Sequence, residues 1–160
     1  MTRDIKKTNA ARYLDEREIA YGLIQYEPDL DDLSAERAAD DIGMPREKVY
    51  KTLVTRGDKT GIIEACLPAG RELDLKALAA ASGNKSVTMA AVKELTALTG
   101  YVRGGCSPIC GKKDYPVYLF SDAVNHEKIA VNAGARGLLF LISPLDLIRV
   151  TGAVLANIAK

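Results

Sequence analysis

Lys51 is the residue of this sequence whose type and position most readily indicate chemistry. It lies in the run 49–55 (VYKTLVT), whose β-branched and apolar residues are typical of a strand. Because side chains alternate along a strand, Lys51 shares a face with Val49 and Leu53. A lysine on such a face is either an edge residue whose ammonium group reaches water, or a partly buried cation aimed at an anionic group. A buried cation needs a partner or a lowered pKa, and both are typical of functional sites.

The loop 99–108 (TGYVRGGCSP) is the second candidate. Its paired glycines, Gly104 and Gly105, permit positive φ and leave backbone N–H groups uncovered, so a substrate carbonyl or phosphate can approach closely. Pro108 stiffens the exit of the loop. A loop of this kind can stabilise an oxyanion without any side-chain nucleophile. The alternative is that the segment is only a tight connector.

Other reactive or charged side chains lie in or beside this loop. Cys106 could act as a nucleophile, although the sequence offers it no clear basic partner. Arg103, Lys112 and Lys113 form a small basic cluster that is sufficient for a few phosphate contacts. The alternative for this cluster is a solvated turn.

Several kinds of site are excluded by the residues that the chain lacks. His126 is the one histidine, and the spacing of Cys66, Cys106 and Cys110 does not give a convincing set of four zinc ligands. The sequence contains neither a G-x-S-x-G nucleophile elbow nor a G-x-x-x-x-G-K-[ST] phosphate loop. We therefore expect neither a metal nor a cofactor, and we interpret His126 as a surface residue near the start of a strand.

Composition indicates one globular domain spanning residues 1–160. The chain has 160 residues, of which 48% are hydrophobic and 27% charged, and its formal net charge is +1. That balance argues against a protein that holds nucleic acid through bulk positive charge, although it permits a local basic patch.

The polar segment 1–18 does not resemble a signal peptide, and the apolar run 138–142 is far shorter than the roughly 20 residues of a membrane span. Together with the odd number of cysteines, this predicts a reduced, cytoplasmic protein without membrane contact.

The pattern of apolar, capping and turn residues predicts the elements that position these candidates. Turn residues between the apolar runs 49–56 and 62–67 predict an antiparallel hairpin. Further strands are expected at 21–26, 85–89, 117–121, 128–132 and 138–141, and helices at 4–18, 34–43, 74–81, 91–98 and from Ser143, where a capping-box-like sequence begins. The connections are too short for helical crossovers throughout, so we expect an α+β fold with a mixed, mostly antiparallel sheet surrounded by helices.

Taken in order, these segments resemble the YbaK/EbsC family. Its members are free-standing relatives of the editing domain that is inserted in bacterial prolyl-tRNA synthetase. The resemblance covers roughly residues 5–158, and the segments that carry it are 49–53 (VYKTL), 73–76 (LDLK), 99–108 (TGYVRGGCSP), 112–113 (KK) and 134–138 (GARGL).

The resemblance implies a compact domain with a curved sheet, the YbaK and prolyl-tRNA synthetase editing-domain fold, and hydrolysis of wrongly charged tRNA, typically Cys-tRNA(Pro). Lys51 matches the essential lysine of the family, and Gly104 and Pro108 match its G-x-x-x-P loop. By the same resemblance, the substrate-binding positions are Tyr50, Thr52, Gly105, Cys106, Ser107 and Gly134, and the tRNA-binding positions are Arg103, Lys112 and Lys113.

In this family the substrate is thought to supply much of the chemistry. The loop backbone holds the aminoacyl group, the lysine engages the 3′ end, and a cysteine thiol can attack its own ester, whereas a ribose hydroxyl can help activate water for other amino acids. The implied partners are the acceptor end of a mischarged tRNA and prolyl-tRNA synthetase. The alternatives are a deacylase for another misacylated tRNA such as Ala-tRNA(Pro), or a non-catalytic module that binds tRNA or a synthetase. Two departures are Leu139, where some members carry an aspartate, and Cys110 at the loop exit.

Overall fold

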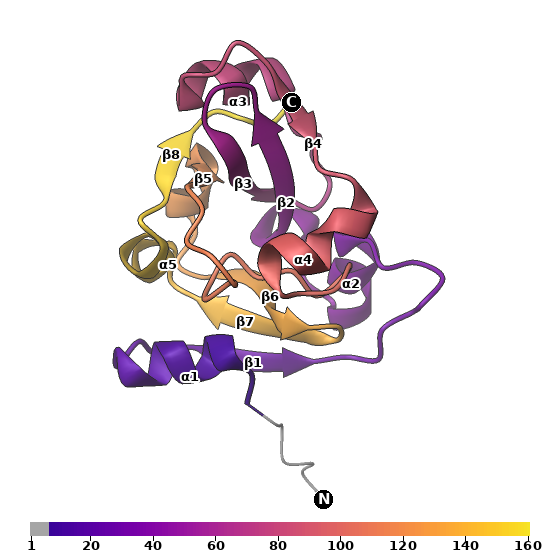
Figure 1. Ribbon diagram of the computed structural model, residues 1–160. Coiled ribbons are helices and arrows are strands. Elements are labelled where there is room, and N and C mark those ends of the chain that lie inside the picture. Colours follow the sequence, from indigo (N-terminus) through magenta and orange to yellow (C-terminus); the bar gives the residue numbers. More distant parts are fainter. Residues whose placement is uncertain (1–6) are drawn as a thin grey trace, which may run out of the picture.

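The computed structural model describes residues 7–160, and a sheet of eight strands forms the centre of this part of the chain (Figure 1). Seven strands follow the order β1-β7-β6-β2-β3-β5-β8, and β4 pairs with β2 off this path. The strands are β1 (Gly22–Gln25), β2 (Val49–Gly57), β3 (Gly61–Pro68), β4 (Val87–Met89), β5 (Val117–Phe120), β6 (Ile129–Ala135), β7 (Leu138–Ile142) and β8 (Val154–Ala156). The helices around them are α1 (Asn9–Glu16), α2 (Ala35–Ile42), α3 (Leu75–Ser82), α4 (Leu95–Thr99) and α5 (Pro144–Thr151), with the short 3-10 helices η1 (Arg46–Lys48), η2 (Val92–Glu94) and η3 (Ser121–Asn125).

The β2–β3 hairpin is the longest paired unit of the sheet, and it confirms the hairpin predicted from the sequence. The two strands are in register from Tyr50 opposite Pro68 to Gly57 opposite Gly61. The turn is held from outside the hairpin, because the Asn84 side-chain oxygen accepts the N–H groups of Lys59 and Thr60 at 2.9 and 3.0 Å.

The sheet is mixed, as predicted. Within the described chain four strand pairs are antiparallel, namely β1–β7, β2–β3, β2–β4 and β6–β7, and three are parallel, namely β2–β6, β3–β5 and β5–β8. With five helices packed around it, this sheet confirms the α+β class. The β2–β6 pair joins strands more than 70 residues apart through just two positions in the described chain, Val49–Ala130 and Tyr50–Val131.

Most helix ends lie where their capping residues predict. The Ser34 and Asp74 side chains accept the N–H groups of Arg37 and Ala77, and thereby cap α2 and α3. At α5 the predicted start with proline in the first turn is confirmed, but the capping box is not formed, because Ser143 makes no side-chain capping bond within the described chain. Helix α1 is shorter than the predicted 4–18, of which residues 4–6 lie outside the described part. Strand β8 was not predicted.

The main hydrophobic core lies between the sheet and its helices and contains Phe140, Leu67, Leu119 and Leu147, all fully buried. A smaller cluster under α2 joins Ala39 to residues of β2, β6 and β7. Figure 1 shows α2 and α4 at the right of the view, and α5 beside β8, the last strand of the sheet, at the left. Among residues 7–160, no helix is both long and apolar enough to cross a membrane.

Candidate functional site

A cavity of about 420 Å³ opens where β2 and β6 stop pairing. Beyond Tyr50 the two strands separate, and the cavity lies in this fork of the sheet. Its walls come from β2, from α2 and the segment before it, from the segment between β4 and α4, and from the loop around Gly104. The cavity therefore brings together residues 31–36, 49–54, 103, 104, 106 and 132, which come from distant parts of the sequence.

Lys51 lines this cavity as a partly buried cation. Its Nζ donates to the Ala69 carbonyl at 3.1 Å, and the Glu36 carboxylate is 3.8 Å away. At Lys51, strand β2 pairs with β3 alone within the described chain, because β6 pairs with it at Val49 and Tyr50 and β4 pairs with it at 55–57, so Lys51 lies at a local edge of the sheet and is also partly buried. The side chain keeps 23% exposure, which leaves its ammonium group accessible to a ligand that enters the cavity.

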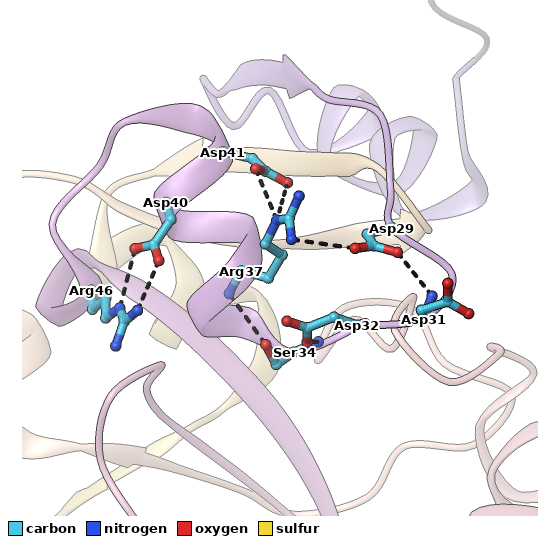
Figure 2. Close-up of polar contacts among 8 residues, drawn as sticks. All are labelled: Asp29, Asp31, Asp32, Ser34, Arg37, Asp40, Asp41 and Arg46. Carbon is cyan, nitrogen blue, oxygen red and sulfur yellow. Dashed lines mark hydrogen bonds and ion pairs between the residues drawn. The ribbon is translucent and has the colours of Figure 1, made fainter.

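Another wall of the cavity is formed by α2 and the acidic segment that leads into it, and Figure 2 shows the polar contacts within these two parts. Arg37 of α2 binds Asp29 at 3.3 Å and Asp41 at 3.1 Å, and so ties the segment to the helix. Asp32 accepts the Ser34 N–H at 3.1 Å, and hydrogen bonding from Ser34 lowers the pKa of the Asp32 carboxyl. Asp31, Asp32 and Glu36 line the cavity, and the Leu33 side chain lies next to Gly104.

Gly104 occupies the position in the loop that requires glycine. Its φ is +80°, and an added Cβ would lie 3.1 Å from the Leu33 side chain. The Gly104 carbonyl accepts the side-chain amide of Asn132 at 3.1 Å, which ties the loop to β6. Gly104 and Lys51 therefore line one cavity, as the sequence interpretation requires.

The remaining loop residues shape the backbone and do not line this cavity. Gly105 is buried against the backbone of Ala135 and Arg136, where a Cβ would lie only 3.1 Å from the Arg136 nitrogen. Ser107 is buried, and its hydroxyl accepts the Ile109 N–H at 3.2 Å. Pro108 lines a different cavity on the other side of the loop. Of the loop, Arg103, Gly104 and Cys106 reach the Lys51 cavity.

The Cys106 sulfur lies in a position that disfavours a nucleophilic role. Burial raises the pKa of the Cys106 thiol, so it stays protonated near neutral pH. The thiol donates to the Val102 carbonyl at 3.5 Å, which uses its proton within the loop. Within residues 7–160, the amide N–H of Cys106 has no hydrogen-bond partner, and because Cys106 lines the cavity, this amide is a candidate donor to a bound carbonyl.

Tyr101 and Gly134 fix the base of the loop. The Tyr101 hydroxyl donates to the carbonyls of Ile109 and Cys110 at 2.6 and 3.0 Å. Gly134 has φ +96°, and a Cβ there would lie 2.9 Å from the Tyr101 ring. Gly134 therefore lies outside the cavity and makes room for the ring. Cys110 adopts a left-handed conformation with φ +56° and lies on the same side of the loop as Pro108.

The other predicted positions divide between the cavity and its surroundings. Thr52 lines the cavity, and its hydroxyl is 3.5 Å from the Cys66 sulfur. Tyr50 also lines the cavity, but its ring is buried and borders a separate cavity that includes His126. His126 is half-buried, so the interpretation of it as a surface residue was wrong. Lys112 and Lys113 are exposed but do not line the Lys51 cavity, in contrast to Arg103.

Asn132 is the main residue that sequence reasoning missed. Its side-chain oxygen accepts the N–H groups of Gly134 and Ala135 at 2.7 and 3.2 Å, and its amide donates to the carbonyls of Gly104 and Ala135. It thus holds a bulge between β6 and β7 against the glycine loop. A polar amide within the apolar run IAVNAGA was the available signal. Glu36 and Leu33 lacked any such signal.

The cavity can therefore hold a small ester-linked group between a cation and an uncovered amide. No metal-binding group of three or more His, Cys, Asp or Glu side chains occurs among residues 7–160, so the donor set does not fit a metal centre. Leu33, Leu53, Leu95 and Leu139 give the cavity apolar walls. Leu139, one of the two departures from the resembled family noted in the sequence, is thus a cavity residue.

Comparison with known proteins agrees with this arrangement. Residues 31–150 match the family model of the aminoacyl-tRNA editing domain. The chain is 44% identical over 153 residues to EbsC of Enterococcus faecalis, provisionally named a Cys-tRNA(Pro)/Cys-tRNA(Cys) deacylase, covering 96% of this chain and 93% of that protein.

Solved structures show the same fold. A protein described provisionally as a trans-editing enzyme for prolyl-tRNA synthetase superposes with a TM-score of 0.79 at 25% identity, covering 97% of this chain and 99% of that chain. The hypothetical protein APE2540 superposes with a TM-score of 0.84 at 23% identity, covering 93% and 97% of the two chains. The match of the family model to most of the chain and the identity to EbsC lead to one conclusion: the chain belongs to the aminoacyl-tRNA editing domain family.

Proposed function

We propose that this protein is a trans-editing deacylase that hydrolyses mischarged Cys-tRNA(Pro). The observation that carries the proposal is the single cavity shared by the Lys51 ammonium group and the glycine loop at Gly104. The name of the 44% identical relative supports the choice of cysteine and of this tRNA. The catalytic positions are Lys51 and Gly104, and Pro108 acts by holding the loop from behind.

The substrate is an ester between an amino acid and the terminal ribose, and its charges suit the two walls of the cavity. The α-ammonium group of the amino acid suits the acidic wall of Asp31, Asp32 and Glu36. Lys51 and Arg103 suit the phosphate of the tRNA terminus. An amide group of the loop, together with Lys51, would stabilise the negative oxygen that develops at the ester carbonyl.

For cysteine, the substrate supplies the nucleophile. Its sulfur bonds to the ester carbonyl carbon, the bond from that carbon to the ribose oxygen breaks, and the thiol proton ends on the ribose hydroxyl. Water then opens the cyclic thioester and releases free cysteine. The role of the protein is to position the reacting groups and stabilise charge, which can give large rate factors without a covalent enzyme intermediate.

Contacts with the body of the tRNA would be few. Arg103 lies at the cavity, and Lys112 and Lys113 lie exposed farther along the loop, where they can reach the phosphate backbone. With a net charge of +1, affinity must be modest, so a complex with prolyl-tRNA synthetase would add binding energy. The solved structure of a trans-editing relative supports this partner.

The test is single-turnover hydrolysis of labelled Cys-tRNA(Pro) by wild type and Lys51→Ala. We expect the rate constant to fall roughly 100-fold, since one charged donor to the reacting ester is removed. Lys59→Ala is the matched control, because Lys59 is exposed in the β2–β3 turn and should not matter. Equal rates for wild type and Lys51→Ala would remove the lysine from the mechanism.

A panel of charged tRNAs separates the alternatives. Faster hydrolysis of Ala-tRNA(Pro) than of Cys-tRNA(Pro) would reassign the substrate within the same enzyme class. Binding of tRNA without release of amino acid from any member of the panel would show a non-catalytic module and contradict the proposal.

A further inference from the structure

The cavity lined by Pro108 lies behind the glycine loop and is distinct from the Lys51 cavity. Its volume is about 320 Å³. Pro108, Cys110 and Gly111 form the wall that it shares with the loop, and α1, β3, β5 and the end of α5 supply the others. This cavity is not used by the proposed reaction.

Glu64 of β3 lines this cavity, and its carboxyl group is both buried and without a full set of hydrogen-bond partners in the described chain. The residue is only 4% exposed, yet its Oε2 atom is buried without a hydrogen-bond partner among residues 7–160. Its backbone lies in the middle of the sheet, opposite Val54 on β2 and Val117 on β5, so strands on both sides hold the Glu64 backbone in place. A buried carboxyl without a partner is costly, and proteins usually satisfy one with a cation or with hydrogen bonds.

The groups that face Glu64 do not supply that partner. The Tyr115 hydroxyl donates to Leu98, and the Thr151 hydroxyl donates to Leu147. Lys113 and Asp114 lie exposed at the mouth, and no ion pair joins Lys113 to Glu64 within the described chain. The remaining titratable groups nearby are those of Tyr13, Cys110, Tyr101, Cys106 and Cys66, none of which is a cation at neutral pH.

We propose that this cavity binds a small organic cation through a primary ammonium group seated on the Glu64 carboxylate. A buried carboxylate attracts an ammonium group through a charge-assisted hydrogen bond, and Asp114 adds a second negative charge at the mouth. Tyr13 and Tyr115 also line the cavity, whose accessible surface is mainly polar, as suits an ammonium group. A bare metal ion fits less well, because a single buried carboxylate is far from the six to eight oxygen ligands of a calcium site.

Binding of this kind has a defined pH dependence. Burial raises the pKa of Glu64 to about 7, so the carboxyl is mainly neutral at pH 5 and mainly ionised at pH 8. A cation binds only the ionised form. Its affinity should therefore be about 100-fold higher at pH 8 than at pH 5, and the bound cation should lower the midpoint of the Glu64 titration.

The test is isothermal titration of the full chain with n-butylammonium chloride at pH 5 and pH 8, at constant ionic strength and without tRNA. We expect binding at pH 8, much weaker binding at pH 5, and loss of the pH-dependent binding in Glu64→Gln, which keeps the shape of the side chain. Glu127→Gln is the matched control, because Glu127 is exposed outside the cavity. Butan-1-ol, which has the same chain without the charge, should bind far more weakly.

Three outcomes would overturn the proposal: equal affinity in Glu64→Gln, equal affinity at the two pH values, or equal binding of butan-1-ol. Urea unfolding of Glu64→Gln verifies that a loss of binding does not come from a loss of the fold. Because no tRNA is present, the result does not depend on the proposed deacylase function, and either can fail without the other.

Discussion

Lys51 and Cys106 line the same cavity, but their surroundings prepare them for different roles. Lys51 is held by a carbonyl at 3.1 Å and remains partly exposed, as a group that must meet a ligand. Cys106 donates its thiol proton to a carbonyl of its own loop. The sequence identified both residues as candidates. Their surroundings in the structure distinguish them: the Lys51 ammonium group stays accessible to a ligand, whereas the Cys106 thiol is hydrogen-bonded within its loop.

Cys106→Ala should keep the rate of Cys-tRNA(Pro) hydrolysis within about threefold of wild type at pH 7. Burial raises the pKa of this thiol, so little thiolate is available to attack an ester. The measurement is the single-turnover rate constant for the two proteins. A loss comparable with that of Lys51→Ala would instead indicate nucleophilic catalysis by Cys106.

Asn132 controls the glycine loop from an adjacent element. We expect Asn132→Asp to lower the hydrolysis rate at least tenfold and the free energy of unfolding by about 1–3 kcal/mol, because a carboxylate cannot donate to the Gly104 carbonyl. Urea unfolding and single-turnover hydrolysis measure the two effects. Asn125→Asp, at an exposed position of η3, is the control. Unchanged activity in Asn132→Asp would show that the loop keeps its conformation without this bond.

Gly137 permits the tight turn between β6 and β7. Its φ is +77°, and an added Cβ would lie 2.4 Å from the Tyr26 carbonyl oxygen. Gly137→Ala should therefore lower the free energy of unfolding by roughly 3 kcal/mol or more. Gly43→Ala is the matched control: φ is +70° there, but nothing lies within 4 Å, so only about 1 kcal/mol of backbone strain is expected. Equal losses in urea unfolding would argue against the clash.

Elements with local signals were predictable from the sequence, and elements that depend on distant partners were not. The β2–β3 hairpin follows from its turn residues, and the ends of α2 and α3 follow from Ser34, Asp74 and the glycines after them. Strand β8 is three residues long and pairs in parallel with β5, so neither a turn nor an alternation marks it. For the same reason the sequence identified Lys51 and Gly104 as candidates but not Asn132 or Leu33, which join the site through the sheet.

At the scale of the whole molecule, the buried Glu64 carboxyl makes stability depend on pH. Burial raises its pKa from 4.5 to about 7, so the folded state holds the proton more tightly than the unfolded state does. The contribution of Glu64 to stability is therefore largest at low pH, falls as the pH rises from about 4.5 to 7, and is lowest above that range.

Relative to Glu64→Gln, the wild type should lose about 2 kcal/mol of unfolding free energy between pH 5 and pH 8. Urea unfolding of both proteins at each pH gives the difference, in which the other titrating groups largely cancel. A constant difference between the two proteins would show that Glu64 has an ordinary pKa and is reached by water.

The fork between β2 and β6 allows the amino-acid selectivity of the cavity to change without a change of fold. Side chains such as Leu139 and Leu33 line the opening, whereas the hydrogen-bonded ladders on either side are made by backbone alone. An exchange of one such leucine for a smaller or polar residue would alter which amino acid fits and leave the strand pairing intact. A single substitution in the cavity lining can therefore change which amino acid is removed from tRNA, while the fold stays the same.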